Sequence, residues 1–547
     1  MPRLLVCTFC AIASISAAQP PEPTPAPVPL AGQIAQILSS PDLAGDHWGI
    51  DITTLDGQPI YSLNAAQLFQ PASNAKLYTT AAALFLLGPD KTFQTVITGK
   101  LNPRTHTVEG DLTLAGGGDA NLDSEDLPYI PPAARPKTPD GKPLPHQPNP
   151  MRDINDLVAQ LAAKGITRIT GDVIGDDTLF PWEPYPQDWS IDDAVWGYGA
   201  PVSALTIQDN ELRLEIAPAA AANQPATVTL EQAVPYYTIQ NEARTVATKA
   251  EATGVQVERS IGSRIVRLYG SIALNDEPDV EHIAIEDPAE YAAMVLRAAL
   301  VEHGIAVTGK ARAQHRPITD GTGFLTMLLR PTEREERVLR GLPQVVACLT
   351  AAPEPGVRTL ASHVSAPLYD DVTLTNKVSQ NLHAELLVHA VGLRMACPQG
   401  STVEGARLIR AFLIHAGIDP GDFIFFDGSG LSGHDLVTPR ATARLLAYAA
   451  TNPKRTPQDA PWFATWHASL PIAGEDGSLL ERFKTGPVKD HVFAKTGTLS
   501  EARALSGYIE TASGRTLIFS IMVGNHLPGS ADRDAMDKIV AAIQSSE

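Results

Sequence analysis

The pattern of hydrophobic residues changes twice along the 547 residues of this chain, and that change constrains its fold most. Helix-like and strand-like segments alternate near both ends, whereas roughly 100 to 350 contains mainly short strands separated by Gly and Asp turns. Two ends of one kind around a different middle predict a single α/β (α+β) domain built from both ends, with β-rich material inserted between them.

The same pattern sets the expected domain boundaries. We expect the first part of the α/β domain over 30–98, inserted β-rich domains over 99–356, and the second part over 357–547. The insert would hold one or two smaller domains, including a nested subdomain at about 205–280. Residues 127–150 contain nine prolines in 24 residues, which predicts an exposed irregular loop.

Several terminal segments have a clear periodicity. WGIDITTLDGQPIYSLN predicts a hairpin with its turn at Asp56-Gly57, and an Ala/Leu-rich helix should run from about Ser73 to Leu87. TLTNKVSQNLHAELLVHAVGL, residues 373–393, predicts one amphipathic helix. Near the C-terminus, HVFAKTGTL, ARALSGYIET and RTLIFSIMVGN predict strands, followed by a final helix over Ala531–Ser545.

The first 18 residues have the organisation of a signal peptide. They carry one positive charge, Arg3, then an apolar run over Leu4–Ile15, then the small residues Ser16-Ala17-Ala18. The run is too short to span a bilayer, and the Pro-rich linker 19–29 follows it. We expect an exported, periplasmic protein with no transmembrane anchor after cleavage.

Export would leave two of the four cysteines in the mature chain. Cys7 and Cys10 lie inside the predicted signal peptide, and neither has the flanks of a lipoprotein cysteine. Cys348 and Cys397 remain, and in an oxidising compartment they permit one disulfide without proving it.

Charge excludes one class of partner. The chain has 42 Lys and Arg against 61 Asp and Glu, a formal charge of −19, and no Lys/Arg-rich run. Such a surface offers nothing to a phosphate backbone, so nucleic acid is excluded, while the oligomeric state stays open. The 14 His are scattered and no His-Glu-x-x-His is present, so we expect neither a zinc site nor another cofactor.

The first candidate catalytic pair is Ser73 and Lys76, at the start of the long helix. Residues three apart share a helical face, so the amine can reach the hydroxyl. A helix N-terminus also points backbone N–H groups toward an oxyanion formed beside the serine. Alone the pair is a weak signal, because an ordinary N-cap beside a solvated lysine has the same spacing.

Two further motifs follow in order. Ser379-Gln380-Asn381 lies in the helical region after the insert, and Lys495-Thr496-Gly497-Thr498 lies on a predicted strand. Each has a competitor. Ser62-Leu63-Asn64 precedes Ser73, in the wrong order, and Lys484-Thr485-Gly486 has polar flanks and a following proline that indicate a surface turn.

Ser-x-x-Lys, then Ser-x-Asn, then Lys-Thr-Gly resembles the signature of penicillin-binding proteins and serine β-lactamases. Longer strings make the chain similar to the class C low-molecular-mass penicillin-binding proteins, the serine D-Ala-D-Ala carboxypeptidase/endopeptidases with a large insert between the first two motifs. The resemblance covers most of the mature chain except 127–150 and 314–350, and it rests on GDLTLAGGGDANL, ITGDVIGDDTLF, YGAPVSALTIQDN, FDGSGLS and AKTGTLSEARALSGYIET.

The resemblance implies a role for each motif residue. Ser73 would be the acyl-forming nucleophile and Lys76 its base, with Ser379 and Lys495 relaying a proton to the leaving amine. Asn381 would bind the peptide substrate. The remaining implied substrate-binding residues are Thr496, Gly497, Thr498 and, in the insert, Asp176, with Asp177 as its neighbouring alternative.

The same resemblance implies peptidoglycan stem peptides and β-lactam antibiotics as the molecules bound. A β-lactamase is the second enzymatic hypothesis, although no Glu-x-x-Leu-Asn follows Ser379. A non-catalytic cell-wall binding protein is the third, although every motif side chain is intact. Ser432, His434 and Asp435 lie too close in sequence for a triad and lack a G-x-S-x-G elbow, so we expect a structural turn near the cleft, and Gly116–Asp119 is expected to be a tight turn.

Overall fold

The structure is a computed structural model that describes residues 29–546 apart from 125–126, 139–150, 320–325, 327, 342–353, 396–398, 453–460 and 528. The predicted signal peptide, nearly all of the Pro-rich linker, all four cysteines and half of the 127–150 loop therefore lie outside the described residues. Those predictions remain predictions.

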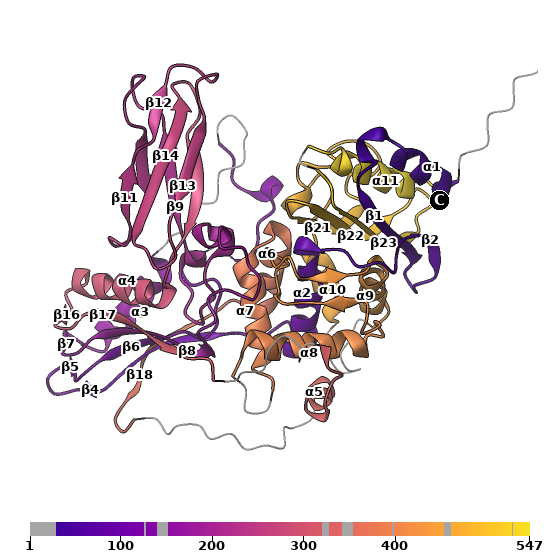
Figure 1. The fold of residues 1–547 in the computed structure, drawn as a ribbon. Helices are drawn as coiled ribbons and strands as arrows, with labels where there is room; N and C mark the ends of the chain where they lie inside the picture. Colours follow the sequence, from indigo (N-terminus) through magenta and orange to yellow (C-terminus); the bar gives the residue numbers. More distant parts are fainter. Residues whose placement is uncertain are drawn as a thin grey trace, which may run out of the picture.

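Both ends of the chain contribute to one antiparallel sheet, in the order β2-β1-β23-β22-β21 (Figure 1). The central pair joins distant segments, since Trp48 lies opposite Val523. This confirms the predicted fold class, a split α/β domain with a β-rich insert. The strands are β1 His47–Thr54, β2 Pro59–Leu63, β21 Val492–Thr498, β22 Ala502–Glu510 and β23 Thr516–Gly524.

Helices cover both faces of this sheet because successive strand side chains alternate between the faces. Leu505 and Ile521 pack on one face with helices α1 Leu30–Leu38 and α11 Asp532–Ser545. Tyr508 and Met522 pack on the other face in the largest core of the domain. That core also involves α2 Ala75–Leu87, α5 Glu333–Leu339, α6 Leu368–Val378, α7 Asn381–Gly392, α8 Thr402–His415, α9 Pro439–Thr451 and α10 Trp462–Ser469, beside the short ribbon of β19 Phe423–Ile424 and β20 Leu436–Val437.

One large apolar core of the insert joins its two helices to two of its sheets and continues into the nested part. A five-stranded sheet has the order β17-β8-β6-β3-β18, and a four-stranded sheet the order β16-β7-β5-β4. Their elements are β3 Gln94–Gly99, β4 Leu101–Asn102, β5 Thr107–Val108, β6 Leu112–Ala115, α3 Arg152–Ala163, β7 Arg168–Ile169, β8 Val173–Pro181, α4 Pro288–Glu302, β16 Ala306–Val307, β17 Ala311–Arg316 and β18 Arg358–Val364.

The nested part of the insert stands away from these sheets as an elongated lobe (Figure 1). One sheet has the order β10-β9-β15, and in another β14 pairs with β11, β12 and β13. The strands are β9 Glu211–Ala217, β10 Thr227–Leu230, β11 Thr238–Asn241, β12 Arg244–Val246, β13 Gly254–Glu258, β14 Ile265–Ala273 and β15 Asp279–Ala284. They fall close to the 205–280 range expected for a nested subdomain.

Strand pairing extends the insert beyond both expected boundaries. β3 begins before residue 99 and β18 ends after residue 356, and the two strands pair with each other within the five-stranded sheet. By pairing, the insert therefore includes residues 94–364. Sequence periodicity could not show this, because an isolated strand carries no signal of the sheet it will join.

The prediction of one helix over 373–393 was wrong. The chain forms α6 and α7, separated by Ser379 in the left-handed region with φ of 65° and by Gln380, whose side chain accepts a hydrogen bond from the Leu382 amide. Hydrophobic spacing continues through the break, and a serine is not a typical helix breaker. A positive φ at a non-glycine residue carries strain, which often marks a functional position.

Candidate active site

Ser73 lies on a strained turn that precedes the buried helix α2. Ala72, with φ of 46°, begins the short 3-10 helix Ala72–Asn74. A Cβ on Gly497 would lie 2.5 Å from the Pro71 carbonyl oxygen and 3.1 Å from the Ser73 amide nitrogen. Only glycine therefore lets β21 approach this turn, which explains the third residue of Lys-Thr-Gly.

Lys76 is completely buried and has three acceptors around its amine. Its Nζ lies 3.0 Å from Ser73 Oγ, 2.6 Å from Asn381 Oδ1 and 2.8 Å from the Ser429 carbonyl oxygen. Burial lowers the pKa of Lys76 to about 8, against the opposing effect of nearby carboxylates. A neutral amine can donate to Asn381 and Ser429 and direct its lone pair at the serine hydroxyl.

A second buried lysine stands on β21. Lys495 Nζ donates to Ser379 Oγ at 2.8 Å and to the Thr496 carbonyl at 3.1 Å. Burial, followed by repulsion from Lys76, holds the pKa of Lys495 well below its ordinary value. The break between α6 and α7 is what directs the Ser379 hydroxyl at this amine.

Asn381 connects the α/β domain to the insert. Its Oδ1 accepts from Lys76, and its Nδ2 donates at 2.8 Å to the Tyr198 carbonyl of the insert. Asn74 makes a second cross-link by donating to the Lys495 carbonyl at 2.9 Å. All three predicted motifs therefore meet at one place, and the insert fixes one of them.

The remaining residues of the third motif lie at the edge of the sheet. The Thr496 hydroxyl contacts the Ser478 hydroxyl at 2.6 Å, while Thr498 is exposed. β21 pairs with β22 on one side, and on its other side Val492 and Ala494 bond to the 471–473 segment. Among the described residues, the outer backbone edge is therefore left for an extended peptide only at Thr496–Thr498.

Three fully buried acidic side chains lie behind Lys76, and sequence analysis assigned none of them a role. They are Glu385 on α7 together with Asp427 and Asp435 of the segment that follows β19. Burial raises the pKa of Glu385 to about 8 and that of Asp435 well above its ordinary value. FDGSGLS, used only for resemblance, was the available signal for Asp427.

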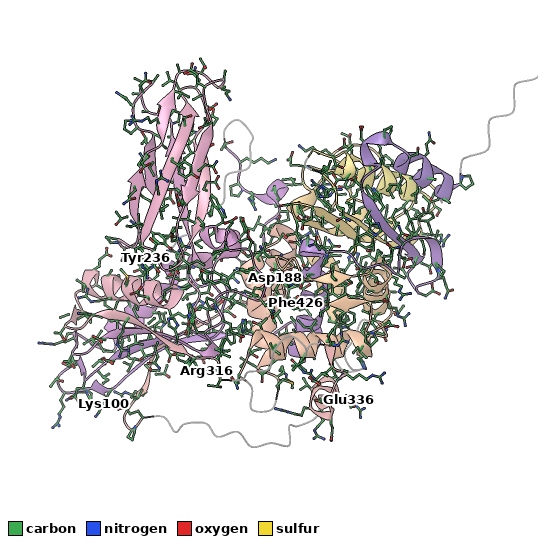
Figure 2. All side chains as sticks on the ribbon, viewed as in Figure 1. Lys100, Asp188, Tyr236, Arg316, Glu336 and Phe426 are labelled. Atoms are coloured by element: carbon green, nitrogen blue, oxygen red, sulfur yellow. The ribbon has the colours of Figure 1, made fainter. Side chains whose placement is uncertain are left out.

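The insert contacts this acidic region directly. Trp189 Nε1 donates to Asp427 Oδ2 at 2.9 Å, and His434 Nδ1 lies 3.1 Å from Asp188 Oδ2. Asp188 and Phe426 lie near one another where the insert meets the catalytic domain (Figure 2). The insert is therefore part of the wall of the site.

The Ser379–Asn381 turn is held by a second carboxylate from the insert. Asp209 accepts from Gln380 Nε2 at 3.0 Å and lies 3.1 Å from His383 Nε2, and the other ring nitrogen of His383 lies 2.7 Å from Asp371. Gln208, Asp209 and Asn210 all have positive φ. Three successive left-handed non-glycine residues are costly, and here they present Asp209 to the turn.

The structure does not bring Asp176 to this cluster. Its carboxylate accepts from the Thr178 amide at 2.8 Å within β8, and Asp177 accepts from Ser203 at 3.0 Å and lies 3.0 Å from His315. Two insert carboxylates do reach the second motif. Asp209 contacts Gln380 directly. Asp193 acts through Tyr198, whose hydroxyl donates to Asp193 at 3.0 Å and whose carbonyl accepts from Asn381. Sequence adjacency in GDDTLF gave no information about this placement.

The competing motifs lie elsewhere. Ser62 ends the hairpin and donates to Asp51 at 2.6 Å, and Lys484 is exposed in an ion pair with Glu481. Ser432 and Asp435 fold around Asp427 and the Phe426 amide, as expected of a structural turn. Gly118 has φ of 79° in the predicted tight turn.

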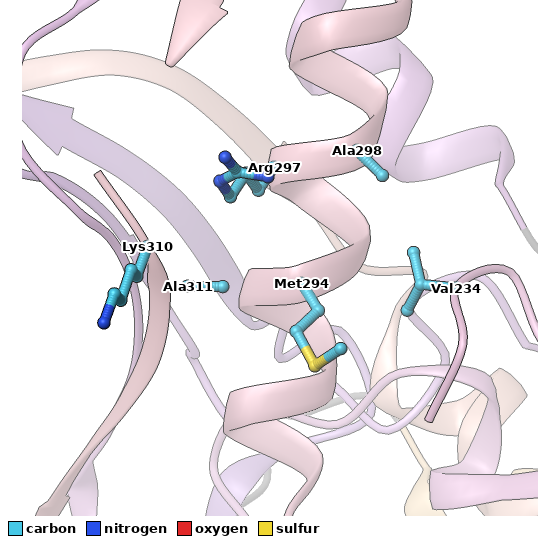
Figure 3. Close-up of a pocket in the computed structure, with 6 residues that line it drawn as sticks. All are labelled: Val234, Met294, Arg297, Ala298, Lys310 and Ala311. Carbon is cyan, nitrogen blue, oxygen red and sulfur yellow. The ribbon is translucent and has the colours of Figure 1, made fainter. Parts of the chain in front are cut away.

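Two hollows bear on ligand binding. One, of about 490 Å³, adjoins the segment Val378–Asn381 and is otherwise lined by insert residues that include Trp196, Tyr198 and His282. The other, of about 410 Å³, lies between α4 and β17 (Figure 3), and no motif residue lines it. Among the described residues, no group of three or more His, Cys, Asp or Glu is placed to hold a metal ion.

Comparison with known proteins places this geometry in a family. The family model described as "D-Ala-D-Ala carboxypeptidase 3 (S13) family" matches residues 30–327 and 344–545. A D-alanyl-D-alanine carboxypeptidase of Actinomadura sp. (strain R39) is 31% identical over 522 residues, covering 93% of this chain and 83% of the relative. D-alanyl-D-alanine carboxypeptidase DacB of Haemophilus influenzae is 24% identical, covering 87% and 84%.

Solved structures agree on the fold. Penicillin binding protein 4 (dacB) from Haemophilus influenzae matches with a TM-score of 0.72 at 22% identity, covering 93% of this chain and 97% of that one. The same protein complexed with a novel β-lactam matches with a TM-score of 0.67. In the part of the chain that is described, every helix is too short or too polar to cross a membrane.

Proposed function

Because this chain belongs to the D-Ala-D-Ala carboxypeptidase 3 (S13) family of class C low-molecular-mass penicillin-binding proteins, we propose that it is a serine enzyme that forms an acyl-enzyme on Ser73. Its substrates would be peptidoglycan stem peptides, cleaved as a D,D-carboxypeptidase and as a D,D-endopeptidase on cross-linked peptides. The observation that carries this proposal is the 3.0 Å contact between Ser73 Oγ and the buried amine of Lys76.

The acylation step uses both lysines. Neutral Lys76 removes the Ser73 proton while the oxygen attacks the carbonyl carbon of the penultimate D-Ala. The backbone N–H groups of Ser73 and Thr498 would hold the resulting oxyanion. When the tetrahedral intermediate collapses, the leaving amine takes a proton from Ser379, and the ammonium form of Lys495 replaces that proton through their 2.8 Å contact. Lys495 is then neutral and Lys76 charged; during hydrolysis a proton from the attacking water returns to Lys495 through Ser379, and Lys76 returns its proton to Ser73.

The geometry of β21 supports a peptide as the acyl donor. An extended chain can pair with the edge of β21 at Thr496–Thr498, beyond the part that bonds to residues 471–473, and Thr496 and Thr498 could receive a terminal carboxylate there. Water then hydrolyses the ester and restores Ser73. Export to the periplasm, where stem peptides occur, belongs to the same proposal and rests on the first 18 residues.

Labelling with a fluorescent penicillin tests the proposal. We expect one covalent label per chain, located by mass spectrometry on the peptide containing Ser73. S73A should lose the label, whereas S62A, changed in the competing Ser-x-Asn string, should keep it. Labelling of S73A would contradict the nucleophile, and rapid nitrocefin turnover by the unchanged protein would favour a β-lactamase.

A further inference from the structure

One side of the Lys76 amine rests on a backbone carbonyl that is held from behind by a buried carboxylate. The Ser429 carbonyl accepts a hydrogen bond from Lys76 Nζ at 2.8 Å, and the Ser429 amide donates to Glu385 Oε1 at 2.8 Å. Glu385 also accepts from the Gly428 amide at 3.0 Å. One peptide segment therefore connects Glu385, which has no exposed surface, to the proposed general base.

The 427–432 loop has little room to move around this contact. Asp427 accepts from the Gly430 and Ser432 amides, both at 2.7 Å. A Cβ on Gly428 would lie 2.7 Å from the Ala384 carbonyl, and one on Gly430 would lie 1.8 Å from the Ala72 carbonyl. The loop is clamped between α7 and the turn that carries Ser73, so the carboxylates decide where the Ser429 carbonyl points.

The charges of Glu385 and Lys76 also influence each other across the Ser429 segment. Among the described residues, no carboxylate makes a hydrogen bond to Lys76. The negative charges that favour its protonated form act from further away, and they belong to Asp427, Glu385 and Asp435. From β21, Lys495 repels it. Glu385 and Lys76 both have pKa values of about 8, so each can change charge in the range where the other does.

We propose that Glu385 is a positioning residue for Lys76, which aims the Ser429 carbonyl at the amine and, through its own charge, sets the pH range in which Lys76 can act as a base. The inference rests on the proposed function. An ionised Glu385 favours the ammonium form, and a protonated Glu385 favours the neutral amine that accepts the Ser73 proton.

The test is the pH dependence of the second-order rate of acylation by a fluorescent penicillin, measured for wild type, E385Q and the control variant D422N. Glutamine imitates a protonated Glu385 and keeps an acceptor for the Ser429 amide. The acidic midpoint of the E385Q profile should move to lower pH by about one unit, because a negative charge near Lys76 is lost. D422N should keep the wild-type midpoint, because Asp422 is a buried carboxylate that pairs with Arg440 and is not one of the groups that act on Lys76.

An E385Q midpoint equal to that of wild type, or an equal shift in D422N, would overturn the proposal for Glu385. Failure of the proposed function would show differently, as absence of acylation in the wild-type protein. If E385Q does not fold, E385D tests the geometry, because its charge stays while the carboxylate withdraws from the loop amides. We expect slower acylation at every pH with the wild-type midpoint, and an unchanged rate would overturn the positioning role.

Discussion

Two buried lysines with lowered pKa values face two serines, and their separate environments give each amine a different task. Carboxylates behind Lys76 favour its charged form. The pKa of Lys495 is lowered by burial and by repulsion from Lys76, and no carboxylate in the described part of the chain opposes these two effects. With a pKa of about 8, Lys76 can both gain and release a proton near neutral pH.

Replacing Lys495 should separate it from its competitor. K495A removes the contact to Ser379 and a positive charge near Lys76, so penicillin acylation should fall at least about 100-fold at pH 7.5. K484A changes the exposed lysine of the other Lys-Thr-Gly string and should acylate at the wild-type rate. Equal rates for the two variants would contradict the role of Lys495.

Sequence analysis found the site residues whose side chains form short motifs. It missed those that act through the backbone or that belong to no motif. Ser73, Lys76, Ser379, Asn381 and Lys495 act through side chains in short ordered motifs, and the structure brings all five together. Ser429 contributes only a backbone carbonyl, which any residue type could supply. Glu385 is the one acidic residue on the buried helix α7, and no motif marks it in the sequence.

Between α6 and α7 the chain carries a buried ion cluster. His383 lies between Asp209 and Asp371 without exposure to solvent, and these carboxylates raise its pKa to about 10 against the effect of burial. Helical periodicity predicted neither the break nor the cluster, since both depend on the insert residue Asp209, which is distant in sequence.

Stability should depend on pH through this cluster. A histidine with a raised pKa stabilises the fold fully below its unfolded pKa of about 6.5, and this contribution is lost as pH rises through about 10. The free energy of unfolding should therefore favour wild type over H383Q most below about pH 6.5, with the difference shrinking as pH rises toward about 10. Urea unfolding of both proteins measures it, and a pH-independent difference would contradict the charged pairing.

Across the whole molecule, the insert and the catalytic domain form one site. The insert provides the Tyr198 carbonyl for Asn381, the Trp189 indole for Asp427 and the Asp209 carboxylate for His383. The resemblance implied that the insert contributes to the site through Asp176, but it did not identify Tyr198, Trp189 or Asp209, because such contacts join segments with no shared pattern.

Removing one of these contacts should affect the site without removing a motif residue. W189F deletes the indole N–H that donates to Asp427, a loss of about 1–3 kcal/mol in stability, and should slow penicillin acylation. W182F alters another insert tryptophan, which stacks on His315 at 4.1 Å, and should acylate normally. Thermal unfolding and acylation rates measure both effects, and a normal rate in W189F would show that the insert contact is dispensable.

The pairing of β3 with β18 has a consequence for how the chain folds. Residues Gln94 and Val364 lie opposite one another, so completing this part of the insert brings together the points where the chain leaves and re-enters the catalytic domain. When β1 later pairs with β23, the pairing closes a much shorter effective loop, so less chain entropy is lost. An insert that folds first would thus speed the closure of a sheet whose strands are made at opposite ends of synthesis.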